Sequence, residues 1–300
     1  MILLKVDRVG AMLKRRVVDK VFAPIKAITV VPYQLCLSFL LLLAPMVEAL
    51  EFTGVWQQGA MLVGQTLPSD RVVFDGRSVT VTPSGHFVAG LGRDVKGPVI
   101  VKVVRDGESQ QFSYPVAQRS YNVQRVNGVP QRTVSSPSAK VLTRIRSEGK
   151  LVRQARADND LRVDFLDGFI KPLEGPITGV YGSQRVYNGT PKNPHYGLDI
   201  ARPTGTVVTA PAAGVVKLVH DDMYYSGGTL IVDHGYGLSS TFIHLSKILV
   251  KPGVRVNAGD ALAEVGATGR ATGPHLDWRV NWFNVRLDPA LVLKYFPAKP

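Results

Sequence analysis

The chain contains a single cysteine, Cys36, in 300 residues. That thiol lies inside an apolar run without the small-residue context of a lipid-attachment cysteine, so no thiol and no disulfide is expected in the chain beyond residue 50. Aromatic residues make up only 8% of the chain and charged residues 20%, whereas 45% of the residues are hydrophobic. This composition excludes a disordered protein, and the length favours two modest domains over one large one.

Acidic residues are scarce at the N-terminus. The first 27 residues carry seven Lys or Arg against Asp7 and Asp19, and the apolar run 28–47 follows and ends in Val47-Glu48-Ala49. This order is typical of a secretory signal peptide with cleavage near Ala49. The run is also long enough for a membrane span, so an uncleaved anchor is the alternative. Both predict an exported protein, periplasmic or anchored to the inner membrane and facing the periplasm, whose only membrane contact is this segment.

Positive charge exceeds negative charge even without this leader. The formal charge of +13 falls to +9 when the +5 of the first 27 residues and the −1 of Glu48 are removed. Outside the cytoplasm such a surface meets anionic wall polymers, lipid headgroups and wall peptides rather than nucleic acid. An anionic cell-envelope surface is therefore the expected partner of the charge, and the alternative is that the charge only aids solubility.

The patterning predicts a mainly β protein in four parts: a leader or anchor (1–49), a small β-sandwich-like domain (50–118), a linker with a basic helix (119–160) and an antiparallel β-sheet domain (161–300). Short Val, Ile and Phe runs alternate with turn signals such as Asp75-Gly76 and Asp106-Gly107 in the second part. Ser136-Pro137 predicts a helix start, and the helix is expected to run to about Ala157. One of its faces is apolar, and the other is basic, solvated and includes Arg156.

Histidines carry the chemistry of the last part. Four of the six histidines lie between 195 and 244, and His275 follows in a Gly-rich context. His195 and Asp199 are too far apart in a straight strand to share one ion, so the chain must curl at Gly197. Each His/Asp pair alone is weak, because a structural histidine is the commoner case.

His275 and Asp277 are two residues apart in a predicted strand, so their side chains emerge on one face. Zinc accepts imidazole nitrogen and carboxylate oxygen, and catalytic zinc sites use three protein ligands. The two pairs, brought together by a sheet, would supply such a set. Trp278 and Trp282 beside them are expected in the core.

The block from about Phe165 to Leu293 resembles the lysostaphin-type (LytM-like) zinc metallopeptidases. The segments that carry the resemblance are His195-Tyr-Gly-Leu-Asp199-Ile, Pro203-Thr-Gly-Thr-Val-Val-Thr-Ala-Pro, Gly214-Val-Val, Gly227-Gly-Thr-Leu-Ile-Val-Asp-His234-Gly, His244-Leu-Ser and Gly266-Ala-Thr-Gly-Arg-Ala-Thr-Gly-Pro-His275-Leu. By this resemblance His195 and Asp199 are ligands of one zinc ion per chain. His244 and His275 are the general base and the stabiliser of the developing oxyanion. His234 matches a framework position, and His220, which has no counterpart, is expected at the surface.

One position departs from the family pattern. The usual His-x-His motif provides a third zinc ligand with its second histidine, and Asp277 stands there instead. A carboxylate also binds zinc, so Asp277 is expected as the third ligand. The second carboxylate lowers the formal charge of the zinc site to zero, which predicts a less acidic bound water and tolerance of manganese or iron.

The resemblance implies a zinc metalloendopeptidase that hydrolyses peptide cross-links of bacterial peptidoglycan. The alternative is a degenerate, non-catalytic member that binds peptidoglycan or activates a separate cell-wall amidase, because loss of a ligand is the usual sign of that fate. Here the replacement can still coordinate and both acid/base histidines remain, which favours the enzyme.

Overall fold

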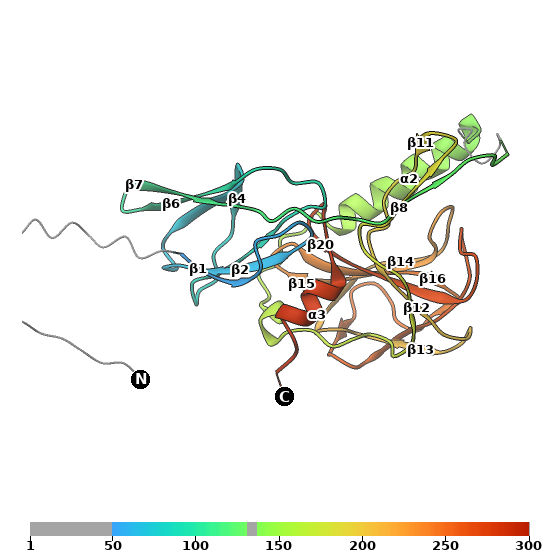
Figure 1. Ribbon diagram of the computed structural model, residues 1–300. Coiled ribbons are helices and arrows are strands. Elements are labelled where there is room, and N and C mark those ends of the chain that lie inside the picture. The colour runs from blue at the N-terminus through green and yellow to red at the C-terminus, as the bar shows by residue number, and fades with distance from the viewer. Residues whose placement is uncertain (1–49, 131–136, 300) are drawn as a thin grey trace, which may run out of the picture. The chain divides into compact units, whose positions relative to one another are not determined.

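The computed structural model describes residues 50–130 and 137–299 (Figure 1). The predicted leader and the Ser136 helix cap lie outside these ranges. Strands dominate the described chain, which confirms the mainly β prediction. No helix within the two described ranges is long and apolar enough to cross a membrane.

Two antiparallel sheets form the region 50–118. The first has the order β1-β2-β5 and the second β4-β3-β6-β7. Their strands are β1 (Glu51–Gly54), β2 (Met61–Gln65), β3 (Arg71–Phe74), β4 (Arg77–Val79), β5 (His86–Gly90), β6 (Val99–Arg105) and β7 (Glu108–Tyr114). Asp75-Gly76 and Asp106-Gly107 form two-residue hairpin turns with positive φ at both positions, as the predicted turn signals require. The boundary near 118 remains a prediction.

The segment predicted as a plain linker contains a strand. β8 (Val123–Val126) pairs in parallel with β10 (Gln184–Tyr187), which also pairs with β11 (Thr190–Pro191). The β8 side chains are mostly exposed, so the sequence shows no apolar alternation there. Backbone pairing with a distant strand therefore orders a polar segment that periodicity reads as linker.

Helix α2 (Ala139–Ala155) begins two residues later than predicted. Ser138 caps it and accepts a hydrogen bond from the backbone N–H of Val141. The predicted apolar face is half-buried, whereas most of the predicted basic face is exposed. Arg156 is the exception, because it is only 5% exposed and donates to Thr241 Oγ1 at 2.7 Å. The prediction that Arg156 belongs to a wet basic face is therefore wrong.

An antiparallel sheet of eight strands organises the C-terminal block. Its order is β18-β14-β15-β16-β20-β12-β9, and β21 pairs with β20. Its strands are β9 (Ile177–Gly179), β12 (Leu198–Ala201), β14 (Gly214–Met223), β15 (Gly227–Gly235), β16 (Leu238–Leu245), β18 (Arg255–Val256), β20 (His275–Trp282) and β21 (Val285–Leu287). Trp278 and Trp282 are buried, as predicted for core residues.

Smaller elements complete the block. A second sheet has the order β13-β19-β17, built from β13 (Val207–Thr209), β17 (Lys247–Ile248) and β19 (Ala261–Glu264). A 3₁₀ turn, η1 (Asp164–Asp167), precedes the main sheet, and helix α3 (Pro289–Tyr295) follows it with Asp288 as its N-cap.

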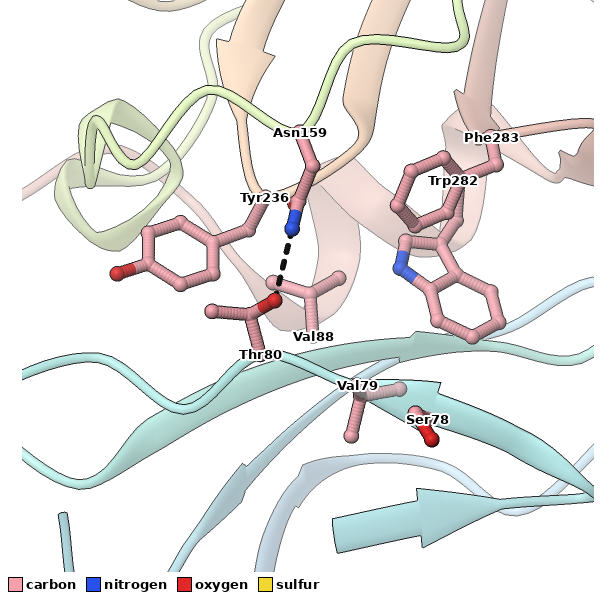
Figure 2. A pocket seen from close by; sticks show the side chains of 8 residues that line it. All are labelled: Ser78, Val79, Thr80, Val88, Asn159, Tyr236, Trp282 and Phe283. Atoms are coloured by element: carbon pink, nitrogen blue, oxygen red, sulfur yellow. Dashed lines mark hydrogen bonds between the residues drawn. The ribbon is translucent and has the colours of Figure 1, made fainter. Parts of the chain in front are cut away.

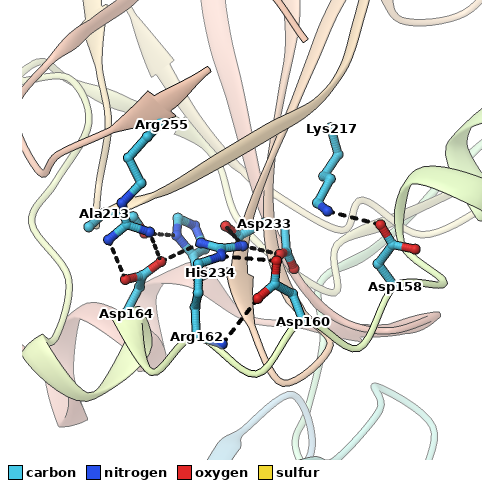
Figure 3. Close-up of polar contacts among 9 residues, drawn as sticks. All are labelled: Asp158, Asp160, Arg162, Asp164, Ala213, Lys217, Asp233, His234 and Arg255. Carbon is cyan, nitrogen blue, oxygen red and sulfur yellow. Dashed lines mark hydrogen bonds and ion pairs between the residues drawn. The ribbon is translucent and has the colours of Figure 1, made fainter. Parts of the chain in front are cut away.

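A charged network fastens the segment before η1 to the main sheet (Figure 3). Arg162 pairs with Asp160, Asp164 and Asp233, and Arg255 donates to both carboxylate oxygens of Asp164 at 2.6 Å. Each acid there has a basic partner, so the network explains the position of the connector rather than a reaction.

Strands of the N-terminal region pack against β20 and β21. A Cβ on Gly90 would come within 2.8 Å of Leu287 and 3.2 Å of Trp282, so close packing requires glycine there. A small pocket lies in this contact (Figure 2), where the Asn159 amide donates to Thr80 Oγ1 at 2.7 Å. Its lining has no histidine, carboxylate, lysine or arginine.

Candidate metal centre and active site

The three predicted ligands meet on the main sheet. One donor atom each of His195, Asp199 and Asp277 lies within 4.8 Å of the others. Asp199 and Asp277 are direct cross-strand partners on β12 and β20, so the sheet places their carboxylates side by side. The chain bends at Gly197, and the curl brings His195 Nε2 to 2.9 Å from Asp199 Oδ1 and 3.4 Å from Asp277 Oδ2.

Two glycines make room for the carboxylates. A Cβ on Gly197 would lie 2.0 Å from Asp277 Oδ1, and a Cβ on Gly179 would lie 2.1 Å from Asp199 Oδ2. Neither glycine has a positive φ, so the space of the missing side chain is what matters. The prediction for Gly197 named only the freedom of its backbone and not the space that its missing side chain leaves for Asp277. The role of Gly179 could not be predicted from a short motif, because Gly179 lies in another segment than Asp199.

The other nitrogen of His195 is held by the backbone. Val180 O lies 3.2 Å from Nδ1, and since a carbonyl only accepts, Nδ1 carries the proton and donates. This contact turns Nε2 toward the carboxylates, as in metal-binding histidines. Burial lowers the pKa of His195, but hydrogen bonds to Asp199 and Asp277 outweigh it and raise the pKa to about 10.

Sequence reasoning missed Arg279. It donates from Nη2 to Asp277 Oδ2 at 2.6 Å and from Nε to Oδ1 at 3.0 Å. Burial acts to raise the pKa of Asp277, yet the charge of Arg279 and the His195 contact hold it well below its usual range. The spacing Asp277-x-Arg279, which places both side chains on one strand face, was the available signal.

The donor set fits zinc. Tetrahedral zinc with bonds of about 2.0–2.1 Å holds its ligands about 3.3 Å apart, close to the separations at His195 Nε2. A carboxylate has about four lone-pair positions, so Asp277 keeps room for an ion beside Arg279. The positive charge of Arg279 also offsets the second carboxylate. The predicted formal charge of zero for the zinc site did not include this arginine.

His244 and His275 face each other beside these ligands. Their ring centroids are 4.9 Å apart, and His275 Nε2 lies 4.0 Å from Asp199 Oδ1. Nδ1 of His244 donates to Thr268 O at 2.8 Å, and Nδ1 of His275 donates to Gly273 O at 2.8 Å. In the neutral rings, both Nε2 atoms are therefore free of a proton and can accept one.

Burial lowers the pKa of His244, which favours the neutral ring at neutral pH. Its backbone is in the left-handed region with φ +67°, at an irregularity in the pairing of β15 with β16. A non-glycine residue there costs about 1–3 kcal/mol and re-aims its side chain. Such cost is typical of a functional position. The loop 266–274 closes on the start of β20, because His275 N donates to Gly266 O at its two ends.

The remaining histidines lie outside the cluster of His195, Asp199 and Asp277. His234 is fully buried on β15 and contacts Ala213 O at 2.7 Å (Figure 3) and Ser240 Oγ at 2.9 Å, contacts that a framework position would make. Burial lowers its pKa to about 4. His220 is half-buried on β14 rather than fully exposed. His86 lies at the start of β5, far in the chain from the metal site.

Comparison with known proteins gives one family. Residues 193–289 match the model of Peptidase family M23. A protein from Pseudomonas aeruginosa, whose crystal structure is described as a peptidase M23, is 32% identical, with a TM-score of 0.63 over 80% of this chain and 96% of that chain.

Two curated relatives come from Vibrio cholerae. Peptidoglycan DD-endopeptidase ShyA is 41% identical over 87 residues, which are 29% of this chain and 20% of that protein. Peptidoglycan DD-endopeptidase ShyB is 39% identical over 113 residues, 38% of this chain and 24% of that protein. The match thus spans less than a quarter of each of these two relatives.

Proposed function

Because the chain belongs to peptidase family M23, we propose that it is a zinc metalloendopeptidase that hydrolyses peptide cross-links of bacterial peptidoglycan. The observation that carries the proposal is the convergence of His195, Asp199 and Asp277 within 4.8 Å. The names of the two Vibrio cholerae relatives support the substrate class.

His195, Asp199 and Asp277 would hold one zinc ion, which would supply a Lewis acid for a water molecule and for the carbonyl of the substrate. His244 Nε2 accepts the proton of the attacking water, because Nδ1 is fixed by Thr268 O and burial keeps the ring neutral. His275, when protonated at Nε2, donates to the oxygen on which negative charge develops.

The alternative is a non-catalytic member that binds peptidoglycan or activates a separate amidase. The contact of Arg279 with Asp277 supports it, because the arginine competes with a metal ion for the same carboxylate. The enzyme is favoured because both acid/base rings keep ordered backbone contacts and His244 keeps its costly left-handed conformation.

Digestion of purified sacculi separates the two. The full chain is incubated with sacculi with and without zinc and chelator, and released peptides are analysed by mass spectrometry. Chelator-sensitive release of new peptide ends, lost in His244→Ala, supports the enzyme. Retention on sacculi without release by the zinc-loaded chain overturns it and supports the binder.

We also propose that the chain acts in the periplasm. Support comes from the basic and apolar order of the first 49 residues and from the expected wall substrate. Fractionation of cells that carry the full chain with a C-terminal tag tests this: a cytoplasmic pool alone would overturn the location, and the mass of the exported form distinguishes cleavage from anchoring.

A further inference from the structure

Three arginines lie near the candidate metal site, and only one of them pairs with a carboxylate in the described residues. Arg279 lies on β20, Arg286 on β21, and Arg156 at the C-terminal cap of α2. Asp277, the partner of Arg279, is the one carboxylate that pairs with any of them in the ranges 50–130 and 137–299. Buried or half-buried cations normally have counterions, so this excess of positive charge requires an explanation.

Strand register brings the three guanidinium groups to one sheet face. Arg279 follows Asp277 by two residues and is the cross-strand partner of Thr241, to which Arg156 Nη2 donates at 2.7 Å. Asn281, two residues further on, is the partner of Arg286. Residues paired across an antiparallel sheet, and residues two apart in a strand, share a face.

Electrostatic coupling agrees with this placement. Burial lowers the pKa of Arg286 to about 10, and the charge of Arg279 contributes to the shift. Burial likewise lowers the pKa of Arg156, with further contributions from Arg286 and Arg279. The Arg286 guanidinium carbon also lies 5.7 Å from the ring centroid of Tyr196, next to the predicted ligand His195.

Unsatisfied polar atoms gather on the same face. Arg156 Nε, Ser239 Oγ and Asn281 Oδ1 are buried without a hydrogen-bond partner, and Ser239 is the cross-strand partner of Asn281. The exposed fractions of the three residues are 5%, 2% and 0%. Such atoms normally contact an ordered water or ion. Arg156 Nε requires an acceptor, the serine hydroxyl can use one, and Asn281 Oδ1 requires a donor such as water.

We propose that Arg279, Arg286 and Arg156 form a binding site for a carboxylate of the substrate. Guanidinium groups bind carboxylates with paired, charge-assisted hydrogen bonds. Two residues along a strand span about 7 Å, so a carboxylate bound here lies at most about two residues of an extended substrate away from the metal ligand Asp277. The substrate class is thus a peptide with a free carboxylate one or two residues from the cleaved amide.

This inference rests on the proposed peptidase function and names the feature by which that site selects its substrate. Arg286 is the member to test, because Arg279 also contacts Asp277 and the buried Arg156 also donates to Thr241. Arg286→Gln removes the charge at similar size, and Arg286→Lys keeps the charge without the planar fork. Arg153→Gln is the control for loss of one positive charge, because Arg153 is an exposed arginine of α2 outside the proposed site.

The test uses the zinc-loaded full chain and pairs of synthetic peptides. The members of a pair have the same cleavable amide and differ only in a free carboxylate or a carboxamide one or two residues away from it. A hydrogen bond to a charged group predicts a preference of about 10- to 100-fold in kcat/KM for the free carboxylate. Arg286→Gln should reduce that preference toward one, Arg286→Lys should retain part of it, and Arg153→Gln all of it.

Equal cleavage of both members by the wild-type chain overturns the carboxylate site and leaves the peptidase proposal intact. An undiminished preference in folded Arg286→Gln, or in Arg286→Lys if the former does not fold, also overturns it. If no peptide is cut, calorimetric titration replaces kinetics. Binding of the free-carboxylate peptide that depends on Arg286 supports the site while the peptidase proposal fails. Stronger binding of inorganic phosphate than of either peptide overturns the substrate assignment.

Discussion

Replacing Asp277 by alanine should destabilise the protein even without metal. Asp277 is 2% exposed and accepts from Arg279 at 2.6 and 3.0 Å. Removal of one member of a buried ion pair costs about 3–5 kcal/mol, because the other charge stays behind. The Arg279 side chain is 24% exposed, so water partly solvates it, and we expect a loss of about 2–3 kcal/mol in the free energy of unfolding.

Urea unfolding in excess chelator, followed by circular dichroism, measures this loss. The double variant Asp277→Ala/Arg279→Met removes both charges and should unfold within about 1 kcal/mol of the wild-type chain. A double variant that is less stable than Asp277→Ala alone would refute the reasoning, because the cost would then not come from the orphaned guanidinium. With zinc at about 100-fold over its Kd, wild type should gain about 2.7 kcal/mol and Asp277→Ala much less.

Three further predictions concern single positions. His244→Asn should abolish peptide release, because it removes the proposed general base. The free energy of unfolding should stay unchanged or rise, because asparagine tolerates the φ of +67° at this position. Retained peptide release would contradict the role of His244 as the base. Gly197→Ala should weaken zinc binding about 10-fold or more, because the added methyl group displaces the Asp277 carboxylate. Gly92→Ala is the control, because a Cβ there comes no closer than 3.8 Å to any other atom and should leave zinc binding unchanged. Equal zinc affinities of the two variants in a titration would contradict this. Burial lowers the pKa of His234 from 6.5 to about 4 in the folded chain, so protons bind the unfolded chain preferentially and the free energy of unfolding falls as pH drops below 6.5. Relative to His234→Gln, wild type should lose about 2 kcal/mol in the free energy of unfolding between pH 7.5 and pH 5. Parallel dependence of the two free energies of unfolding on pH would rule this out.

Short motifs predicted part of the candidate metal site, because each of its two His/Asp pairs lies within one short segment. The alternation of β20 places His275 and Asp277 on one face, and the bend at Gly197 returns His195 to Asp199. The residue types and the family resemblance named the three candidate ligands, whereas the contact of Asp199 with Asp277 depends on the pairing of β12 with β20.

Contacts made across long separations could not be predicted in the same way. Arg156 belongs to a helix whose sequence indicates a solvated basic face, and only the docking of α2 shows that it reaches Thr241. Gly179 and Asp199 are neighbours through strand pairing that no local pattern encodes. The strand β8 likewise owes its order to β10, because a polar segment has no apolar face to reveal it.

The attachment of α2 to the sheet bears on where this protein can be divided. Glu148 accepts from the backbone N–H of Tyr224 at 2.9 Å, and Arg156 ends on β16 at Thr241. A fragment that starts at residue 161 would retain every proposed zinc ligand yet lose both of these anchors. The smallest piece that keeps the surroundings of the proposed zinc ligands whole must therefore include the helix, so the helix belongs with the half of the chain that carries these ligands rather than serving as a spacer ahead of it.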